Sequence, residues 1–280
     1  MQVFHTIDEL KIKLAEYTIL DKTIGFVPTM GALHDGHVSL INFSKKQCDV
    51  TVCSIFVNPT QFNNSEDLAR YPKTPENDIL LLTHAGCDFL YMPTVDDIYP
   101  PDFNRTFHFG YLETILEGAS RAGHFNGVGQ VVSILLEGIK PHKAFFGSKD
   151  YQQVMIVKTL VKQLNLPVEI VSCPILREPD GLAMSSRNMR LTAQERKVAA
   201  LIPKFLNEVK GMIKPSGIDE AKKWMKHQIE SEPLMTFDYF EVCDATSLHE
   251  LKEYDETVST VLLIAVFVGK IRLIDNLIIS

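Results

Sequence analysis

The sequence has little cysteine, one tryptophan and no long apolar run. Its five cysteines form no CxxC pair and three lie within apolar stretches, so we expect buried thiols rather than a disulfide framework or a metal site. The longest apolar run, Val258 to Val268, is too short to cross a bilayer, which takes about 20 residues, and is better interpreted as a buried strand. The N-terminal segment has charges where a signal peptide needs an apolar stretch. These observations predict a cytoplasmic protein with no membrane segment.

Basic charge is also scarce. Lys and Arg total 28 against 35 Asp and Glu, so the formal net charge of the 280 residues is −7. A dedicated binder of nucleic acid or of acidic membranes needs a field of the opposite sign, so neither is expected as a partner. Any anionic ligand must therefore be held by a local site. The hydrophobic share of 45% is typical of a globular chain, and the length predicts one large or two modest domains.

Strands alternate with helices through about the first 175 residues. This rhythm predicts an α/β fold with a parallel sheet, right-handed crossovers and helices on both faces. Ligands in such sheets bind beyond the carboxyl ends of the strands. We expect strands at 23–27, 48–57, 87–92, 143–146 and 168–175, and helices from Thr6, from about His37, and over 74–86, 127–139 and 150–164.

The rhythm changes beyond Arg177. Thr192 and Glu195 form a capping box, Pro203 kinks or ends that helix, and residues 214–217 are typical of a turn. Closely spaced strands late in the chain predict a small C-terminal α+β domain. We expect domains at 1–176 and 177–280, with a helix over 218–229 and strands over 237–242, 258–268 and 271–274 in the second.

The sharpest motif is PTMGALHDGH, at residues 28–37, directly after a strand and at the start of a helix. Gly31 and Gly36 let backbone N–H groups approach a ligand, and a helix N-terminus favours phosphate. His34 and His37, three positions apart, can both donate to a phosphoryl oxygen. The alternative is a Gly-rich turn with two surface histidines, and residue type and spacing leave both interpretations open. A zinc pair is disfavoured because helical zinc ligands sit at i and i+4 with an intervening glutamate.

A second strand-to-helix junction carries Gly147-Ser148-Lys149-Asp150. Lys149 can meet a phosphate, and Asp150 can bind a ribose hydroxyl. The alternative gives Asp150 only a helix cap, paired with Gln153 in a capping box. Capping and binding are compatible, so both interpretations stay open.

Three further polar segments are candidates for binding. Residues 181–188 (GLAMSSRN) offer two hydroxyls and a guanidinium that can wrap a triphosphate, although a solvated Ser-rich linker has the same composition. Asn58 and Gln61 follow the strongest strand and can read a small polar substrate, although a turn is the simpler interpretation. Arg121 and His124 lie in a loop that could present both side chains to a ligand. The commonest interpretation of such a segment is only a loop that leads into the next helix.

Six motifs in order resemble one known family. PTMGALHDGH, SIFVNPTQF with EDLARYPKT, RAGHFNGV, FFGSKDYQQ, REPDGLAMSSRN and RLIDN, between Thr23 and Asn276, are similar to the pantothenate synthetases, the pantoate–β-alanine ligases of coenzyme A synthesis. The resemblance implies a Rossmann-like nucleotidyltransferase domain, a smaller C-terminal domain and a homodimer. It also implies two steps, in which pantoate reacts with Mg-ATP to give pantoyl adenylate and β-alanine then displaces AMP.

The resemblance also implies roles for individual residues. His37 matches the histidine named catalytic, with His34 as its companion and Lys149 at the phosphates. Gln61 and Gln153 match the amides that bind pantoate, and Gln61 also lies near β-alanine. No protein residue is expected as a metal ligand. The ATP-binding positions would be Met30, Gly31, Ala32, Leu33, His34, Asp35, Gly36, His37, Gly147, Ser148, Lys149, Asp150, Leu176, Met184, Ser185, Ser186 and Arg187.

The sequence departs from the family pattern at Ala122, Gln130 and Ser148, where proline, threonine and a glutamate or glutamine are common. The first change would loosen a loop and the second would alter the pantoate pocket. Two other functions fit the same motifs. A different nucleotidyltransferase would yield a dinucleotide and pyrophosphate, and a nucleotide-binding regulator would bind ATP without releasing pyrophosphate.

Overall fold

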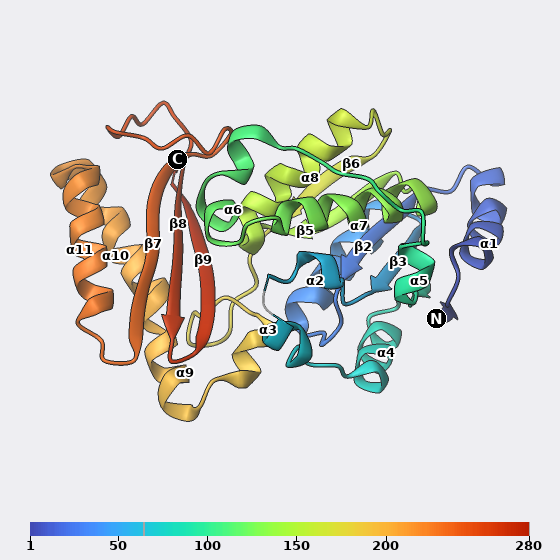
Figure 1. The fold of residues 1–280 in the computed structure, drawn as a ribbon, viewed down its shortest axis with the longest axis horizontal. Helices are drawn as coiled ribbons and strands as arrows, with labels where there is room; N and C mark the ends of the chain where they lie inside the picture. Colours follow the sequence, from blue (N-terminus) through green and yellow to red (C-terminus); the bar gives the residue numbers. More distant parts are fainter. Residues whose placement is uncertain (64, 280) are drawn as a thin grey trace. The chain divides into compact units, whose positions relative to one another are not determined.

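Residues 1–63 and 65–279 are described by a computed structural model, which divides the chain into two compact units. The first unit is Met1–Pro174 and the second begins at Ile175, close to the boundary expected after Leu176. The first holds a six-stranded parallel sheet flanked by helices, and the second holds a small antiparallel sheet with three helices (Figure 1). The predicted fold class, an α/β unit followed by a smaller α+β unit, is confirmed.

All strand pairs of the first sheet are parallel, in the order β1-β4-β3-β2-β5-β6. The short β1, which pairs with β4, was not expected, because three residues carry too little pattern to mark a strand. The strands are β1 Gln2–Phe4, β2 Ile24–Thr29, β3 Val50–Ile55, β4 Phe89–Tyr91, β5 Lys143–Gly147 and β6 Glu169–Cys173.

Helices cover both faces of this sheet, as the alternating rhythm predicts. Phe26 packs in a cluster with α1, α7 and α8, whereas its neighbour Val27 packs on the opposite face with α2 and α4. The helices are α1 Ile7–Ile19, α2 Asp35–Gln47, α3 Ser65–Ala69, α4 Pro75–His84, α5 Val95–Ile98, α6 Leu116–Ser120, α7 His124–Ile139 and α8 Tyr151–Gln163, with 3₁₀ turns η1 Pro59–Gln61, η2 Gly110–Glu113 and η3 Ser148–Asp150.

Two boundaries near the site differ from expectation. Strand β2 continues through Pro28, because β5 pairs with β2 only at Gly25 and Phe26, so the side of β2 away from β3 needs no N–H at the proline. Helix α7 begins at His124 rather than Gly127, with Gly123 at φ 80° as its N-cap. His124 is therefore on a helix and not in a loop.

In the second unit three helices pack on the sheet β7-β8-β9. The capping box of Thr192 and Glu195 is present. Residues 214–216 continue a helix, however, and the chain turns only at Gly217, because a proline in the last helical turn removes little hydrogen bonding. The elements are η4 Ser186–Arg190, α9 Ala193–Ala199, α10 Leu201–Ser216, α11 Ile218–Glu230, β7 Met235–Asp244, β8 Thr260–Val268 and β9 Ile271–Ile279.

All five cysteines are free thiols and four of them are buried, as their apolar surroundings predict. Burial raises the pKa of Cys87 to about 12 and that of Cys173 to about 11, so these thiols stay protonated near neutral pH. Over the part of the chain that the structure describes, no helix is both long and apolar enough to span a membrane.

Candidate active site

The strand order brings three of the predicted motifs to one edge of the first sheet. Strand β3 lies on one side of β2 and β5 lies on the other, so the chain builds the sheet outward in opposite directions from this point. The loop after β2 carries residues 30–34, the turn after β5 carries 148–150, and the segment after β3 carries 58–61. Because all these strands are parallel, the three segments leave the sheet at its carboxyl edge, where a doubly wound fold forms its ligand crevice.

The buried carboxylate of Asp78 accepts hydrogen bonds from the loop after β2. Gly31 and Ala32 both have left-handed backbone, with φ of 81° and 49°. The next turn directs the N–H groups of Ala32 and Leu33 at the carboxylate of Asp78 on α4, at 3.0 and 2.8 Å. The N–H of Gly36 donates to His34 Nδ1 at 3.1 Å. These backbone donors, which the sequence suggested would approach a ligand, already have partners within the chain.

His34 and His37 form a reciprocal cap at the start of α2. Their rings lie 4.1 Å apart between centroids. His34 Nδ1 accepts from the N–H of Gly36, and His37 Nδ1 accepts from the N–H of His34 at 3.3 Å. An imidazole nitrogen that accepts carries no proton, so each neutral ring has its N–H at Nε2. Each ring is therefore set to donate from Nε2.

His37 is neutral at physiological pH. Burial of the ring, then the neighbouring His34, then the charge of Lys149 lower its pKa from 6.5 to about 3. The influence of Lys149 also means that the cation after β5 acts on the histidine after β2. Of the sequence-predicted trio, His34 and His37 therefore lie in contact, and the charge of Lys149 acts on His37.

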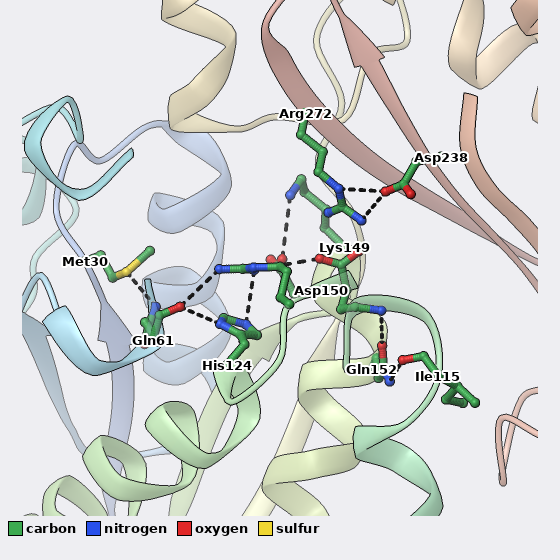
Figure 2. Close-up of polar contacts among 11 residues, drawn as sticks. Met30, Gln61, Ile115, His124, Lys149, Asp150, Gln152, Asp238 and Arg272 are labelled. Carbon is green, nitrogen blue, oxygen red and sulfur yellow. Dashed lines mark hydrogen bonds and ion pairs between the residues drawn. The ribbon is translucent and has the colours of Figure 1, made fainter. Parts of the chain in front are cut away.

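Gln61 lies between two polar anchors. Its side-chain Nε2 contacts Met30 Sδ at 2.8 Å (Figure 2). Its Oε1 accepts from Asn58 Nδ2 at 3.2 Å. Asn58 is almost fully buried, and its oxygen also accepts from Tyr99 and Thr60. Asn58 is therefore committed to holding the segment, whereas Gln61 ends beside Met30 in the loop after β2.

His124 and Arg121 fix the main chain at Gln61. His124 Nδ1 lies 2.8 Å from the carbonyl oxygen of Gln61, and Arg121 Nη2 donates to the same oxygen at 3.2 Å. Because a carbonyl only accepts, His124 Nδ1 must donate, and its Nε2 then accepts from Arg121 Nη1 at 3.2 Å. Burial first, and Arg121 second, lower the pKa of His124 to about 4. Arg121 and His124, which the sequence predicted in a loop, therefore hold the main chain of Gln61, a predicted substrate-binding residue.

Two adjacent glutamines at the start of α8, Gln152 and Gln153, differ in their contacts. Gln152 is buried, accepts from the N–H of Glu117 at 2.9 Å and donates to the carbonyls of Leu112 and Ile115, so it fastens the segment before α6 (Figure 2). Gln153, one position on, is half-buried, and its side-chain amide makes no hydrogen bond with the described residues. Its amide is the one that the family pattern assigns to pantoate.

Asp150 does not cap α8 through its side chain. It occupies the N-cap position without a side-chain cap bond, so the capping box with Gln153 is absent. Its carboxylate lies 3.7 Å from Lys149 Nζ and is about half exposed. Ser148, a departure from the family pattern, starts the short turn η3 before it.

The second unit holds the remaining predicted ATP positions. The N–H of Met184 donates to the carbonyl of Leu176 at 3.0 Å, which joins two of them directly. Ser185 caps η4 by accepting from the N–H of Arg187, and Ser186 is buried. The segment is therefore packed and folded, unlike a solvated linker.

A buried ion pair braces this segment. Arg177 Nη1 and Nη2 donate to the two carboxylate oxygens of Asp275 on β9 at 2.7 and 3.0 Å, and Asp275 is almost completely buried. Arg177 also forms a bridge with Ala183 in the returning chain. The late RLIDN motif, which contains Asp275, thus supports the residues around Met184.

Two other residues that depart from the family pattern make hydrogen bonds to neighbouring segments. Gln130 on α7 donates to the carbonyl of Arg105 at 2.7 Å and so holds the neighbouring segment. The carbonyl of Ala122 accepts from the side-chain amide of Asn63. Each hydrogen bond joins two segments of the first unit that are distant in the sequence.

Sequence reasoning missed Asp78. Its signal was an acid four residues before the buried Leu82, on the inward face of α4, where a charged residue is unusual unless it is paired. Among the described residues no cluster of three or more His, Cys, Asp or Glu side chains is arranged to hold a metal ion.

Comparison with known proteins agrees with this arrangement. The sequence matches the pantoate-beta-alanine ligase family over residues 2–278. A pantothenate synthetase of Porphyromonas gingivalis is 45% identical over 278 residues, covering 99% of both chains. The crystal structure of pantothenate synthetase from Thermus thermophilus superposes with a TM-score of 0.92 at 37% identity, covering 99% of both chains.

A further structure adds ligands. The pantoate-beta-alanine ligase of Francisella tularensis, described as complexed with beta-gamma ATP and beta-alanine, has a TM-score of 0.80 at 36% identity and covers 99% of this chain and 97% of its own. Family match, identity and fold agree along the whole length, and this chain belongs to the pantoate–β-alanine ligase family.

Proposed function

We propose that this protein joins pantoate and β-alanine to form pantothenate, with ATP converted to AMP and pyrophosphate through a pantoyl-adenylate intermediate. Family membership and the ligands named for the Francisella relative support the overall ligation. The observation that carries the chemistry is the reciprocal pair of His34 and His37 after β2, whose His37 ring is neutral and feels the charge of Lys149 after the neighbouring β5.

In the first step a carboxylate oxygen of pantoate attacks the α-phosphorus of ATP, and the bond to the pyrophosphate oxygen breaks. Negative charge builds on the oxygens of the α-phosphoryl group. His37 and His34 donate to these oxygens from Nε2, where the neutral His37 ring keeps its proton because its Nδ1 accepts from the backbone. Lys149 supplies the fixed positive charge that the histidines lack.

In the second step the amine of β-alanine attacks the activated carbonyl carbon, loses a proton, and AMP leaves. A free carboxylate is a poor acyl donor, and adenylation supplies the leaving group. Gln61 and Gln153 hold pantoate by neutral amide hydrogen bonds, and Gln61 also lies near β-alanine. The brace of Asn58, Arg121 and His124 keeps Gln61 in place between the steps.

We assign ATP the positions that the family resemblance implies. In the first unit we assign it residues 30–37 and 147–150, and in the second Leu176 and residues 184–187, where Arg187 adds charge for the phosphates. Mg²⁺ would enter with the nucleotide, as the family resemblance implies, because phosphate oxygens are ligands of the kind that this ion prefers. When bound, the ion neutralises phosphate charge.

We further propose a nucleotide- and pantoate-binding role for the first unit, a lid role for the second, a homodimer and a cytoplasmic location. These follow from family membership and from the sequence. Sedimentation of the purified protein would give its oligomeric state, and a monomer at micromolar concentration would contradict the dimer.

Pyrophosphate exchange tests the proposed activity. Purified protein should incorporate labelled pyrophosphate into ATP only when pantoate is present, because the reverse reaction needs the pantoyl adenylate. Exchange should occur without β-alanine, and its addition should yield pantothenate and AMP. Exchange that is independent of pantoate, or a dinucleotide product, would contradict the proposal.

A further inference from the structure

We propose that Asp78 on α4 is a positioning residue that holds the loop after β2, and through it the pair His34 and His37, in its active arrangement. The proposal deepens the proposed function, because the histidines matter through the adenylation assigned to them. Asp78 itself touches no reacting atom.

The carboxylate of Asp78 is fully occupied by the loop and by its own helix. It accepts from the N–H of Ala32 at 3.0 Å, from the N–H of Leu33 at 2.8 Å and from the hydroxyl of Thr74 at 3.0 Å. The residue is 1% exposed. A buried carboxylate needs such donors, and two backbone N–H groups that converge on one anion fix the direction of the chain between them.

The loop has little freedom once these bonds form. Gly31 and Ala32 are both left-handed, an arrangement that costs energy at the alanine and persists only where the surroundings impose it. A Cβ on Gly31 would lie 3.1 Å from Asp78 Oδ2 and 3.1 Å from Ile55 Cγ2, so the loop is packed tightly against both groups. Asp78 supplies the partner that makes this backbone conformation favourable.

The histidines follow the loop directly. Leu33, whose N–H binds Asp78, precedes His34, whose own N–H donates to His37 Nδ1. The carbonyl of His34 in turn accepts from the N–H of His37 at 2.8 Å. A shift at Leu33 therefore moves both imidazoles and exposes the half-buried ring of His37 further to solvent.

The decisive experiment is Asp78→Asn, followed by NMR titration of the His37 ring. An amide keeps the size of the carboxylate but accepts through only one oxygen, so at least one loop N–H loses its partner. In the wild type the His37 signal should not titrate between pH 8 and pH 5. In the variant its pKa should rise to within about one unit of the ordinary 6.5. Loss of a nearby negative charge would lower a histidine pKa, so a rise can come only from a changed position.

Two control variants isolate the effect. Asp88→Asn removes a carboxylate that accepts the N–H of Thr51 at 2.8 Å, at the opposite, amino end of the same sheet. Thr74→Val removes the hydroxyl donor but leaves both loop bonds. Neither should shift the His37 titration. Pantoate-dependent pyrophosphate exchange should fall about 10- to 100-fold in kcat for Asp78→Asn, the range expected for misplaced catalytic groups, and stay within about twofold in the controls.

Hydrogen exchange of the wild-type protein gives a test that does not depend on folding of a variant. The amides of Ala32 and Leu33 should exchange slowly although they lie in a loop. Free exchange of both amides, or a folded Asp78→Asn protein with unchanged His37 titration, would overturn the positioning role. Because both readouts ignore turnover, they separate this proposal from the ligase activity, whose failure would appear as wild-type protein without pantoate-dependent exchange.

Discussion

At the scale of single residues the site depends on histidines kept neutral by their surroundings. Burial, the neighbouring His34 and the charge of Lys149 lower the pKa of His37 to about 3, far below physiological pH. A ring with that pKa is a poor proton shuttle near neutrality but a constant hydrogen-bond donor. Residue type and spacing were enough to identify the pair, but the tautomer depends on backbone N–H groups that only the folded loop brings to Nδ1.

We expect His37→Ala to lower the rate of pantoate-dependent pyrophosphate exchange about 10²- to 10³-fold, the loss typical of one oxyanion-type donor. Because the folded pKa is about 3, wild-type kcat should show no ionisation of His37 above about pH 4. Stopped exchange assays across pH 5–9 check both points. His84→Ala, at the exposed end of α4, is the matched control, and wild-type turnover in the His37 variant would remove that residue from the mechanism.

His124 predicts a dependence of stability on pH. Its pKa falls from 6.5 to about 4 on folding, so the unfolded chain binds the proton more tightly between these values. Stability from this residue is therefore complete above pH 6.5 and declines as the pH falls toward 4. Between pH 7 and pH 5 the loss should be about 2 kcal/mol.

The variant His124→Asn isolates this contribution. Its amide nitrogen keeps a donor for the carbonyl of Gln61 but does not titrate. Urea unfolding at pH 7 and pH 5 should give a loss of stability smaller in the variant than in the wild type by about 2 kcal/mol. Equal losses in both proteins would show that the ring does not have the lowered pKa.

At the scale of elements, periodicity and caps predicted most of the fold. Apolar spacing located α1 and α8, and the capping box at Thr192 located α9. The errors arose where tertiary contacts override local rules. Pro28 stays in β2 because no strand needs its N–H, and His124 joins α7 although Gly127 follows closely. Asp78 escaped notice because its partners are backbone groups more than forty residues away, and no spacing rule reports them.

Gly127 sets the distance between α7 and the Gln61 segment. A Cβ there would lie 2.4 Å from the carbonyl oxygen of Thr60 and 2.8 Å from the nitrogen of Gln61, both backbone atoms that cannot rotate away. Gly127→Ala should therefore destabilise the protein by about 1–3 kcal/mol despite the better helix propensity of alanine. It should also raise KM for pantoate and β-alanine more than KM for ATP.

Gly138→Ala is the control on the same helix. Its Cβ would meet Cδ1 and Cγ1 of Ile7, side-chain atoms that can shift by rotation where backbone atoms cannot, so stability should fall less than in Gly127→Ala and all three KM values should stay close to wild type. Thermal unfolding and initial-rate kinetics of the two variants make the comparison. Similar behaviour of both would mean that the close approach at Gly127 does not position Gln61.

At the scale of the whole molecule, the charge balance and the local site have opposite character. The chain carries a net charge of −7, yet its proposed phosphate contacts include the cations Lys149 and Arg187. A polymer of phosphates gains affinity by displacing counterions over an extended basic surface, which an acidic protein does not offer. A single nucleotide needs only a local cluster of donors.

We therefore expect a non-hydrolysable ATP analogue to inhibit pyrophosphate exchange competitively with ATP, whereas polyadenylate at equal phosphate concentration should inhibit less than twofold at about 0.15 M salt. Repeating the assay at low salt sharpens the test, because attraction to a polyanion would grow steeply there and repulsion would keep inhibition weak. Strong inhibition by polyadenylate at either salt would mean that the acidic balance of the chain does not govern which anion reaches the site.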